Sequence, residues 1–414
     1  METCDRLVRT CKEAMRILLI CDGIPPMALG GGGRIVWETS VGLARRGHEV
    51  TIITAAEQGQ LPFENDGVRI RTIQPRGKRW AHYRGVFSAA PLREIRRILD
   101  DVQPDVIHAH NITWQAGYRW ISAAHRVSRE RERERERERV PVVMTTHDTM
   151  MVSYGKVRGN ENTVWSRDLQ RMRWEYNPFR NLLIRRYLRD VAAVLCVSDA
   201  LRLFLERYGF HKLQTLHNGI DTTFWREVSP KTDARRALNL PTDAPLFLLA
   251  GRIGTDKGSE ALLHAMPPDA HVLLAGRADL SGFALLGKRL HYFAHQTPEE
   301  MRLLYSAADA TVVPSIYLDP FPTVCLESMA CTRPVIATCM GGAKEVVEDG
   351  KTGWVVDPRS SAFAERLQWC SDHREELTSF GKAGRERVEK EFSLEKNLDA
   401  LLALYKRVIG NVSV

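Results

Sequence analysis

Short apolar runs alternate with amphipathic segments along the first half of the chain. The run 15–23 is apolar and ends at Gly23, which predicts a buried strand, and the amphipathic segment 34–47 predicts a helix that ends at Gly47. We interpret the four glycines between them, Gly30–Gly33, as a loop. The pattern continues with strands predicted at 48–54, 66–73, 104–110, 140–148 and 191–198, and helices at 92–103 and 113–127. Repeated β-α units predict a mostly parallel sheet with helices on both faces.

The same alternation begins again after about residue 215. We therefore expect an N-terminal extension (1–14), a first α/β domain (15–214), a second α/β domain (215–392) and a terminal helical segment (393–414). The predicted strands of the second domain are 244–253, 270–278, 290–295, 310–315, 333–338 and 353–356, with helices such as 299–309 and 321–331 between them.

One segment, 129–139, departs from this pattern because Arg and Glu alternate strictly along it. Alternation places opposite charges at i,i+3 and like charges at i,i+4, so the pair energies of a helix roughly cancel, and no apolar face is left to bury. We interpret the run as a solvated extension of the preceding helix or as a disordered insertion. An arm that binds nucleic acid or lipid is the alternative, and the net charge of only +1 on these residues argues against strong phosphate binding.

Composition limits the class of protein without choosing a function. The 414 residues carry a net charge of +8, which fits either an ordinary basic protein or a surface that meets anions such as sugar phosphates, nucleic acid or acidic lipid. The eight cysteines form no CxxC pair, so we expect reduced thiols and a cytoplasmic protein. The N-terminus does not resemble a signal peptide, and no apolar run approaches the roughly 18–20 residues of a membrane helix, so any membrane contact is expected to be peripheral.

A basic and aromatic stretch, 76–93, is the part of the chain suited to such a contact. It could touch anionic lipid, and it could equally be a solvated loop and helix surface. Its cations are Arg76, Lys78, Arg79, Arg84 and Arg93, with Trp80, Tyr83 and Phe87 between them.

Two cations follow the first predicted strand of the second domain. Arg252 comes directly after that strand, and Lys257 lies five residues later, just before a helix is predicted to begin. An Arg provides a fork of hydrogen bonds and a Lys a compact charge, so a pair in a strand-to-helix loop suits a diphosphate. Each cation alone would more often be a surface residue.

Two acids, Asp319 and Glu327, flank a Pro-Phe-Pro-Thr sequence. The prolines exclude a helix before Phe321, and Thr323 is a plausible N-cap for a helix that carries Glu327 one turn inside. The free N–H groups of that helix would favour an anion. The spacing suits a sugar nucleotide, with the sugar at Asp319, the phosphates at the helix start and the ribose at Glu327. The structural alternative is an ordinary loop followed by a helix-capping Glu.

Histidines end two predicted strands of the first domain, at 108–110 and at His147 with Asp148. Ligands of open α/β sheets bind at the carboxyl ends of strands, which makes His147 the stronger functional candidate. A lone histidine is usually structural, and no third metal ligand is evident, so no metal site is predicted.

These motifs, in this order, resemble the family-4 retaining glycosyltransferases of the GT-B fold over about residues 15–410. The resemblance implies two Rossmann-like domains that face a central cleft, an acceptor domain followed by a donor domain, and a C-terminal helix that packs back on the first domain. It rests on the following pieces: "GGGGR", "PDVIHAH", "VMTTHD", "CVSDALRLFLERYG", "LHNGID", "GRIGTDKG", "DPFPTVCLESMAC", "RPVIAT" and "GGAKEVVEDGKTGWVV".

The resemblance also implies roles for individual residues. Arg252 and Lys257 match the cations that hold the donor diphosphate, and Glu327 matches the second acid of an E-x7-E motif, which binds the donor ribose. Asp319 stands where the first acid is usually Glu, so we expect a retained role with altered reach.

The remaining matches concern the sugar, the phosphates and the base. His147 matches the histidine that approaches the transferred sugar, and Gly32 and Gly33 match the glycine loop near the phosphates and acceptor. The backbone of Phe321, Pro322 and Thr323 matches the turn that contacts the donor sugar and phosphate, while Phe293 and His295 fall where the base edge is read.

The resemblance therefore implies a metal-independent, retaining hexosyltransferase. It would use a UDP- or GDP-sugar and an acceptor hydroxyl in a glycan, lipid or small molecule, with no nucleic-acid partner and possible peripheral contact with an anionic membrane. The alternatives are another enzyme of the same fold, such as a nucleotide-sugar epimerase or a phosphorylase, and a non-catalytic sugar-nucleotide-binding or scaffold protein. A nicotinamide-dependent oxidoreductase is disfavoured because Ile35 and Val36 occupy the third-glycine places of the GxGxxG fingerprint.

Overall fold

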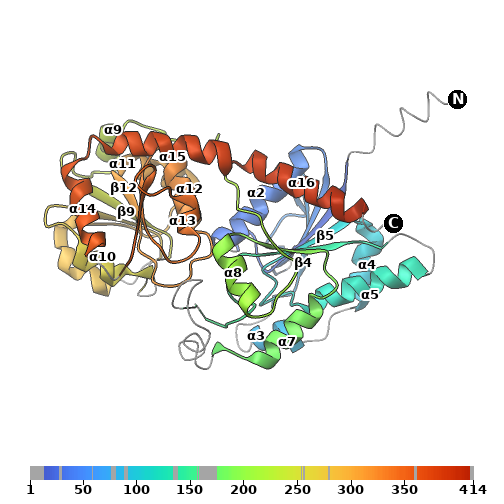
Figure 1. The fold of residues 1–414 in the computed structure, drawn as a ribbon. Helices are drawn as coiled ribbons and strands as arrows, with labels where there is room; N and C mark the ends of the chain where they lie inside the picture. Colours follow the sequence, from blue (N-terminus) through green and yellow to red (C-terminus); the bar gives the residue numbers. More distant parts are fainter. Residues whose placement is uncertain are drawn as a thin grey trace.

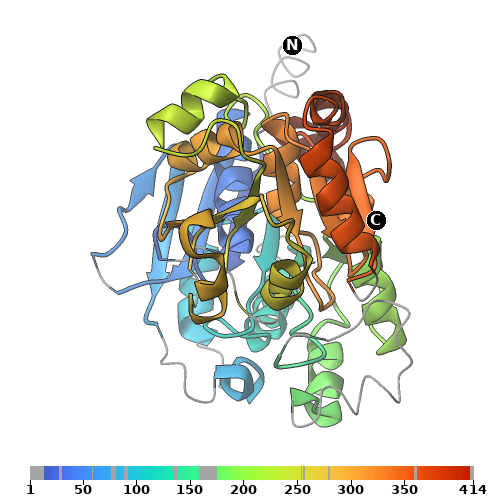
Figure 2. The same ribbon diagram turned by 90° about the vertical axis from the view of Figure 1, so that its left-hand side faces the viewer.

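The chain forms two α/β domains that lie side by side (Figure 1). Figure 2, the view from the left-hand side of Figure 1, has the second domain in front of the first. The two domains follow one another along the sequence, as the repeated alternation predicts. The structure is a computed structural model, and it describes residues 14–27, 30–57, 59–75, 81–87, 92–133, 139–155, 157, 175–252, 254, 257–277, 280–358 and 361–410.

The first sheet has the strand order β3-β4-β2-β1-β5-β6-β7-β8, parallel except for the short antiparallel edge strand β3. Its central strands are apolar and almost wholly buried, as expected when helices cover both faces. Its strands are β1 (Arg16–Cys21), β2 (Glu49–Ala55), β3 (Glu64–Asn65), β4 (Val68–Ile73), β5 (Val106–His110), β6 (Val142–Thr146), β7 (Ala193–Cys196) and β8 (Leu213–Thr215), and its helices are α2 (Gly31–Arg45), α3 (Ala81–Phe87), α4 (Leu92–Val102), α5 (Arg119–Arg133), α7 (Pro178–Tyr187) and α8 (Asp199–Arg207).

The second sheet is parallel throughout, in the order β11-β10-β9-β12-β13-β14. Its strands are β9 (Leu246–Ala250), β10 (His271–Ala275), β11 (Leu290–Phe293), β12 (Ala310–Val313), β13 (Val335–Thr338) and β14 (Gly353–Val356), and its helices are α9 (Lys231–Ala237), α10 (Ser259–Ala265), η3 (Ser281–Arg289), α11 (Pro298–Ala307), α12 (Thr323–Ala330), α13 (Ala343–Val346), α14 (Ala362–Asp372) and α15 (Leu377–Glu391).

The C-terminal helix α16 (Leu394–Gly410) crosses back from the second domain and packs on the first (Figure 1). Its apolar stripe includes Leu398, Leu401 and Tyr405, which join the core cluster of β1 and α2. A Cβ at Gly42 of α2 would lie 2.6 Å from Leu398 Cδ1, so glycine is what permits this close packing. The two α/β domains and the returning helix confirm the predicted fold class.

Two local predictions are wrong. Helix α2 begins at Gly31, so Gly31, Gly32 and Gly33 form its first turn and are not the predicted loop. The first turn of a helix makes few intrahelical hydrogen bonds through its N–H groups, which limits the cost of glycine there. Helix α12 begins at Thr323 itself, with Pro322 in the N-cap position and no side-chain cap, so Thr323 is not the N-cap.

The Arg-Glu run continues α5 as far as Arg133, and residues 134–138 lie outside the described residues. Glu130 accepts from Arg126 one turn earlier and from Arg96 of α4, at 3.1 and 2.7 Å. The described part of the run is therefore the solvated helical extension predicted as one alternative. Residues 76–80 of the basic and aromatic stretch also lie outside the described residues.

Candidate active site

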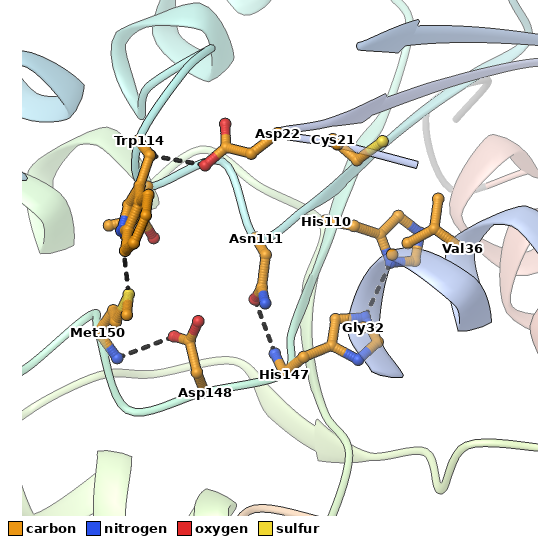
Figure 3. A pocket seen from close by; sticks show the side chains of 13 residues that line it. Cys21, Asp22, Gly32, Val36, His110, Asn111, Trp114, His147, Asp148 and Met150 are labelled. Carbon is orange, nitrogen blue, oxygen red and sulfur yellow. Dashed lines mark hydrogen bonds between the residues drawn. The ribbon is translucent and has the colours of Figure 1, made fainter. Parts of the chain in front are cut away.

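The carboxyl ends of β5 and β6 form one wall of a cavity of about 200 Å³ in the first domain (Figure 3). His110 is the last residue of β5, and His147 directly follows β6, so the parallel sheet places them side by side. The first turn of α2 lies against them: a Cβ at Gly32 would be 3.6 Å from the Cβ of His147. The structure thus brings together His147 with Gly32 and Gly33, which also line the cavity.

Hydrogen bonds hold the backbone and the ring of His147. Its backbone N–H donates to Oδ1 of Asn111 at 2.9 Å, and its Nε2 lies 3.2 Å from Nδ1 of His110. Burial lowers the pKa of His147 to about 4, so the ring is neutral at pH 7. A neutral imidazole can donate or accept a hydrogen bond with a sugar hydroxyl.

Lys257 and Asp319 form a partly buried ion pair in the second domain, with Lys257 Nζ 2.7 Å from Asp319 Oδ2. The same oxygen accepts from Ser315 Oγ at 3.1 Å and from the Tyr317 hydroxyl at 3.3 Å. Burial alone would lower the pKa of Lys257, but the charge of Asp319 and the neighbouring tyrosine raise it, so Lys257 carries a full positive charge. In this arrangement Asp319 orients Lys257.

The loop that carries Lys257 is fixed by a glycine. Gly258 has φ of +73°, and a Cβ there would lie 1.8 Å from the carbonyl oxygen of Pro314. No other residue fits this position without moving the end of β12. The close approach holds Lys257 against the segment that leads to Asp319.

Glu327 is buried on α12 and is held from both domains. Arg34 of α2 forms an ion pair with its Oε1, and the Tyr305 hydroxyl donates to its Oε2 at 2.9 Å. The Arg34 guanidinium also lies 5.0 Å from the centre of the Trp225 ring and 3.4 Å from Glu38 of its own helix. Both carboxylate oxygens of Glu327, the residue predicted to bind the ribose, therefore already have side-chain partners within the protein.

Helices α2 and α12 meet at their N-termini. A Cβ at Gly31 would lie 3.1 Å from Oγ1 of Thr323, so the two helix starts are almost in contact across the domains. Each helix start carries free backbone N–H groups and the positive end of a helix dipole. This junction is suited to an anion such as a diphosphate.

The other predicted site residues lie at different places in the second domain. Phe321 is buried against His217, with ring centroids 5.2 Å apart, so its side chain is not available to a ligand. Arg252 is exposed two residues beyond β9. Phe293, half-buried, ends the edge strand β11 and His295 is exposed just after it, so β10 separates both from β9.

Sequence reasoning missed several residues of the site. Arg34 follows the glycine run directly, Asp22 follows β1, and Asn111 follows β5, so their places at strand or helix ends were the available signal. Tyr305, inside α11, carried no such signal.

Two negative findings concern the described residues alone. Within the described ranges, no three His, Cys, Asp or Glu side chains gather as a group able to hold a metal. No helix in the same part of the chain combines the length and apolar character needed to cross a bilayer.

Two family profiles match the chain in consecutive segments. Residues 29–224 match Glycosyltransferase Family 4, and residues 230–387 match Glycosyl transferases group 1. The first segment contains His147 and most of the residues that line its cavity, and the second contains Lys257, Asp319 and Glu327.

Similar proteins extend over nearly the whole chain. D-inositol 3-phosphate glycosyltransferase of Mycobacterium bovis is 26% identical over 454 residues, which cover 98% of this chain and 86% of the relative. Sucrose-phosphate synthase of Thermosynechococcus elongatus has a TM-score of 0.76 at 24% identity, covering 95% of this chain and 99% of that one. Anabaena HepE, solved with UDP-glucose, has a TM-score of 0.70 at 16% identity, covering 95% of this chain and 100% of that one. The chain belongs to the family-4, group 1 glycosyltransferases, with the GT-B fold.

Proposed function

We propose that this glycosyltransferase moves a hexose from a UDP- or GDP-sugar to an acceptor hydroxyl, with retention of anomeric configuration and without a metal. The observation that carries the proposal is the contact of the two helix starts: Thr323 meets Gly31, and the adjacent Gly32 meets His147. A diphosphate at this junction would lie between the second domain and the His147 cavity. Solved structures of the similar HepE contain UDP and UDP-glucose, which supports a nucleotide-sugar donor.

The charges at the junction suit the leaving diphosphate. As the bond between the anomeric carbon and the diphosphate oxygen breaks, negative charge grows on that oxygen. Lys257, oriented by Asp319, and the N-terminus of α12 would stabilise it. We assign Arg252 to the same diphosphate from its place after β9, and Glu327 to the donor ribose.

The transfer step needs neither a protein nucleophile nor a metal. In a same-face mechanism, the acceptor oxygen forms its bond to the anomeric carbon on the face that the diphosphate leaves. The acceptor proton passes to the departing phosphate oxygen, which balances the reaction. His147, neutral at pH 7, would hydrogen-bond the transferred sugar from the first domain.

Slow donor hydrolysis tests the stereochemistry without knowledge of the acceptor. Purified protein treated with a chelator would be incubated with UDP-glucose or GDP-mannose, and the released hexose followed by proton NMR before it mutarotates. We expect the α-anomer first, as in the donor, and no effect of the chelator. Release of the β-anomer first, or loss of turnover on chelation, would overturn the retaining or metal-independent part of the proposal.

We further propose that the first domain touches an anionic membrane from the cytoplasmic side. Helices α3 and α7 expose a patch of four apolar side chains, with Phe87 and Phe179 stacked at 6.2 Å between ring centroids. Both helices contain arginines and no acidic residue. An apolar patch with basic surroundings is the composition of an interfacial membrane contact. The four side chains, with exposed fractions of 36–59%, are Tyr83, Phe87, Phe179 and Leu182.

A further inference from the structure

The cavity of the first domain contains two carboxylates that the donor assignment leaves unused, Asp22 and Asp148 (Figure 3). We propose that this cavity binds the acceptor as a single uncharged sugar or cyclitol ring, and that it rejects a ring that carries phosphate. The inference rests on the proposed function, since it names the class of molecule that receives the hexose. Three properties of the cavity carry it: its size, its charge and the Asp148 carboxylate oxygen that makes no hydrogen bond to the described residues.

The size of the cavity suits a small occupant. Its volume of about 200 Å³ is below the range of roughly 300–1,000 Å³ typical of pockets for drug-sized ligands. A single six-membered ring with its hydroxyl groups is of a size that fits this volume. Trp114 and Met150 lie at one side and His147 at the other, so an apolar ring face and polar ring edges would meet different walls (Figure 3).

The charge of the cavity disfavours phosphate. Asp22 and Asp148 are both acidic, and none of the described lining residues is Lys or Arg. Arg180 lies nearby, but its buried guanidinium donates to the backbone carbonyls of Met150 and Met151, at 2.7 and 3.4 Å. Burial raises the pKa of Asp22 to about 7 and that of Asp148 to about 6, so at pH 7 Asp148 is mostly ionised and Asp22 about half ionised. A phosphate dianion beside them would add like-charge repulsion.

One carboxylate of the cavity can accept a hydrogen bond from a hydroxyl group. Asp22 is occupied by the backbone N–H groups of residues 114–116, which fix this wall. Asp148 accepts from the Met150 N–H at Oδ1, 2.9 Å away, while its Oδ2 has no hydrogen-bond partner among the described residues. Nε2 of His110 and Nδ1 of His147 also have no partner among the described residues, but both are buried away from the cavity surface.

Hydroxyl groups both donate and accept, so a polyol ring in the cavity can donate a hydrogen bond to the Asp148 carboxylate, which lines it. Asp148 is therefore the residue we expect to position the acceptor ring.

Ligand-observed NMR titration tests the inference directly. The probes are D-glucose, D-mannose, myo-inositol and one monophosphate of each, added to the full chain, to Asp148→Asn, and to the exposed control Asp269→Asn. We expect at least one neutral ring to bind and its monophosphate to bind at least tenfold more weakly. Loss of a hydrogen bond to a charged group should lower the affinity of Asp148→Asn for the neutral ring about tenfold or more, with no change in the control.

Two results would overturn the inference: a monophosphate that binds as well as its neutral ring, or no binding by any of the six probes. Calorimetric titration of UDP and GDP in the same samples separates the two proposals. Nucleotide binding with preference for phosphorylated rings would end the neutral-ring inference alone. Neutral-ring binding without any nucleotide binding would end the transfer function alone.

Discussion

At the scale of single residues, the carboxylate of Asp319 is committed to Lys257. One oxygen of Asp319 accepts from Lys257, Ser315 and Tyr317 together. The sequence placed the transferred sugar at Asp319, whereas the geometry makes this acid the partner that orients a cation. An Asp in place of the usual Glu shortens the side chain by one methylene. This length is consistent with the ion pair to Lys257 on a neighbouring loop, whose Nζ lies 2.7 Å from Asp319 Oδ2.

Lys257→Met should lower donor turnover roughly 100- to 1,000-fold, the usual loss when one group that stabilises transition-state charge is removed. Donor turnover would be followed by nucleotide release, with circular dichroism to verify the fold. Lys382→Met, at an exposed position of α15, is the matched control and should keep full turnover. Turnover of Lys257→Met within twofold of the unaltered protein would remove Lys257 from the diphosphate site.

At the scale of helices, the junction of the two domains is shaped by the approach of α2 and α12. Glycine at position 31 lets the two helix starts come together, and Arg34 one turn later reaches Glu327. Glu327 can bind a ribose only if Arg34 releases it or shares it. In the unliganded protein Arg34 is paired with Glu327, so a nucleoside that binds has to compete with Arg34 for this carboxylate.

Arg34→Met should raise the affinity for nucleotide diphosphates several-fold, because the ribose no longer displaces a cation. It should also lower the free energy of unfolding by roughly 3 kcal/mol, since Glu327 loses its buried partner. Fluorescence titration and denaturant unfolding measure the two effects. Weaker nucleotide binding in Arg34→Met would show instead that Arg34 is part of the nucleotide site.

The strands and the helix pattern of both domains were predictable because apolar runs end at glycines and amphipathic stripes repeat at helical spacing. The places of Lys257 just before one helix and of Glu327 one turn inside another were also predictable, while the roles of both residues stay predictions. The Arg34–Glu327 pair was not, because it joins residues 293 positions apart through the docking of two domains. The glycine run was assigned to a loop because glycine disfavours helices in general, while the contact that requires it, at Thr323, is tertiary.

At the scale of the molecule, the two domains face each other while α16 ties the second back onto the first (Figure 1). The exposed patch on α3 and α7 belongs to the first domain, which also holds the proposed acceptor cavity. Met150 at that cavity accepts from Arg180 of α7, so the patch and the cavity share a structural element. A membrane under α7 would therefore lie close to the acceptor side of the protein.

The double substitution Phe179→Ser and Leu182→Ser should weaken binding to vesicles that contain phosphatidylserine at least tenfold, because it removes the two most exposed apolar side chains of α7. Both side chains are more than half exposed, so the fold should be unaffected. Vesicle co-sedimentation is the measurement, with Leu285→Ser in the second domain as the control. Equal sedimentation of the double variant and the control would contradict the membrane contact.

The central claim is that the junction of α2 and α12 binds a sugar nucleotide through Glu327. Calorimetric titration of UDP, GDP and ADP, with the unaltered protein and with Glu327→Gln, tests it most directly. We predict that UDP or GDP binds and that the substitution weakens this binding tenfold or more, because a ribose loses hydrogen bonds to a charged acceptor. Absence of binding by all three nucleotides, or equal binding by both proteins, would contradict the account.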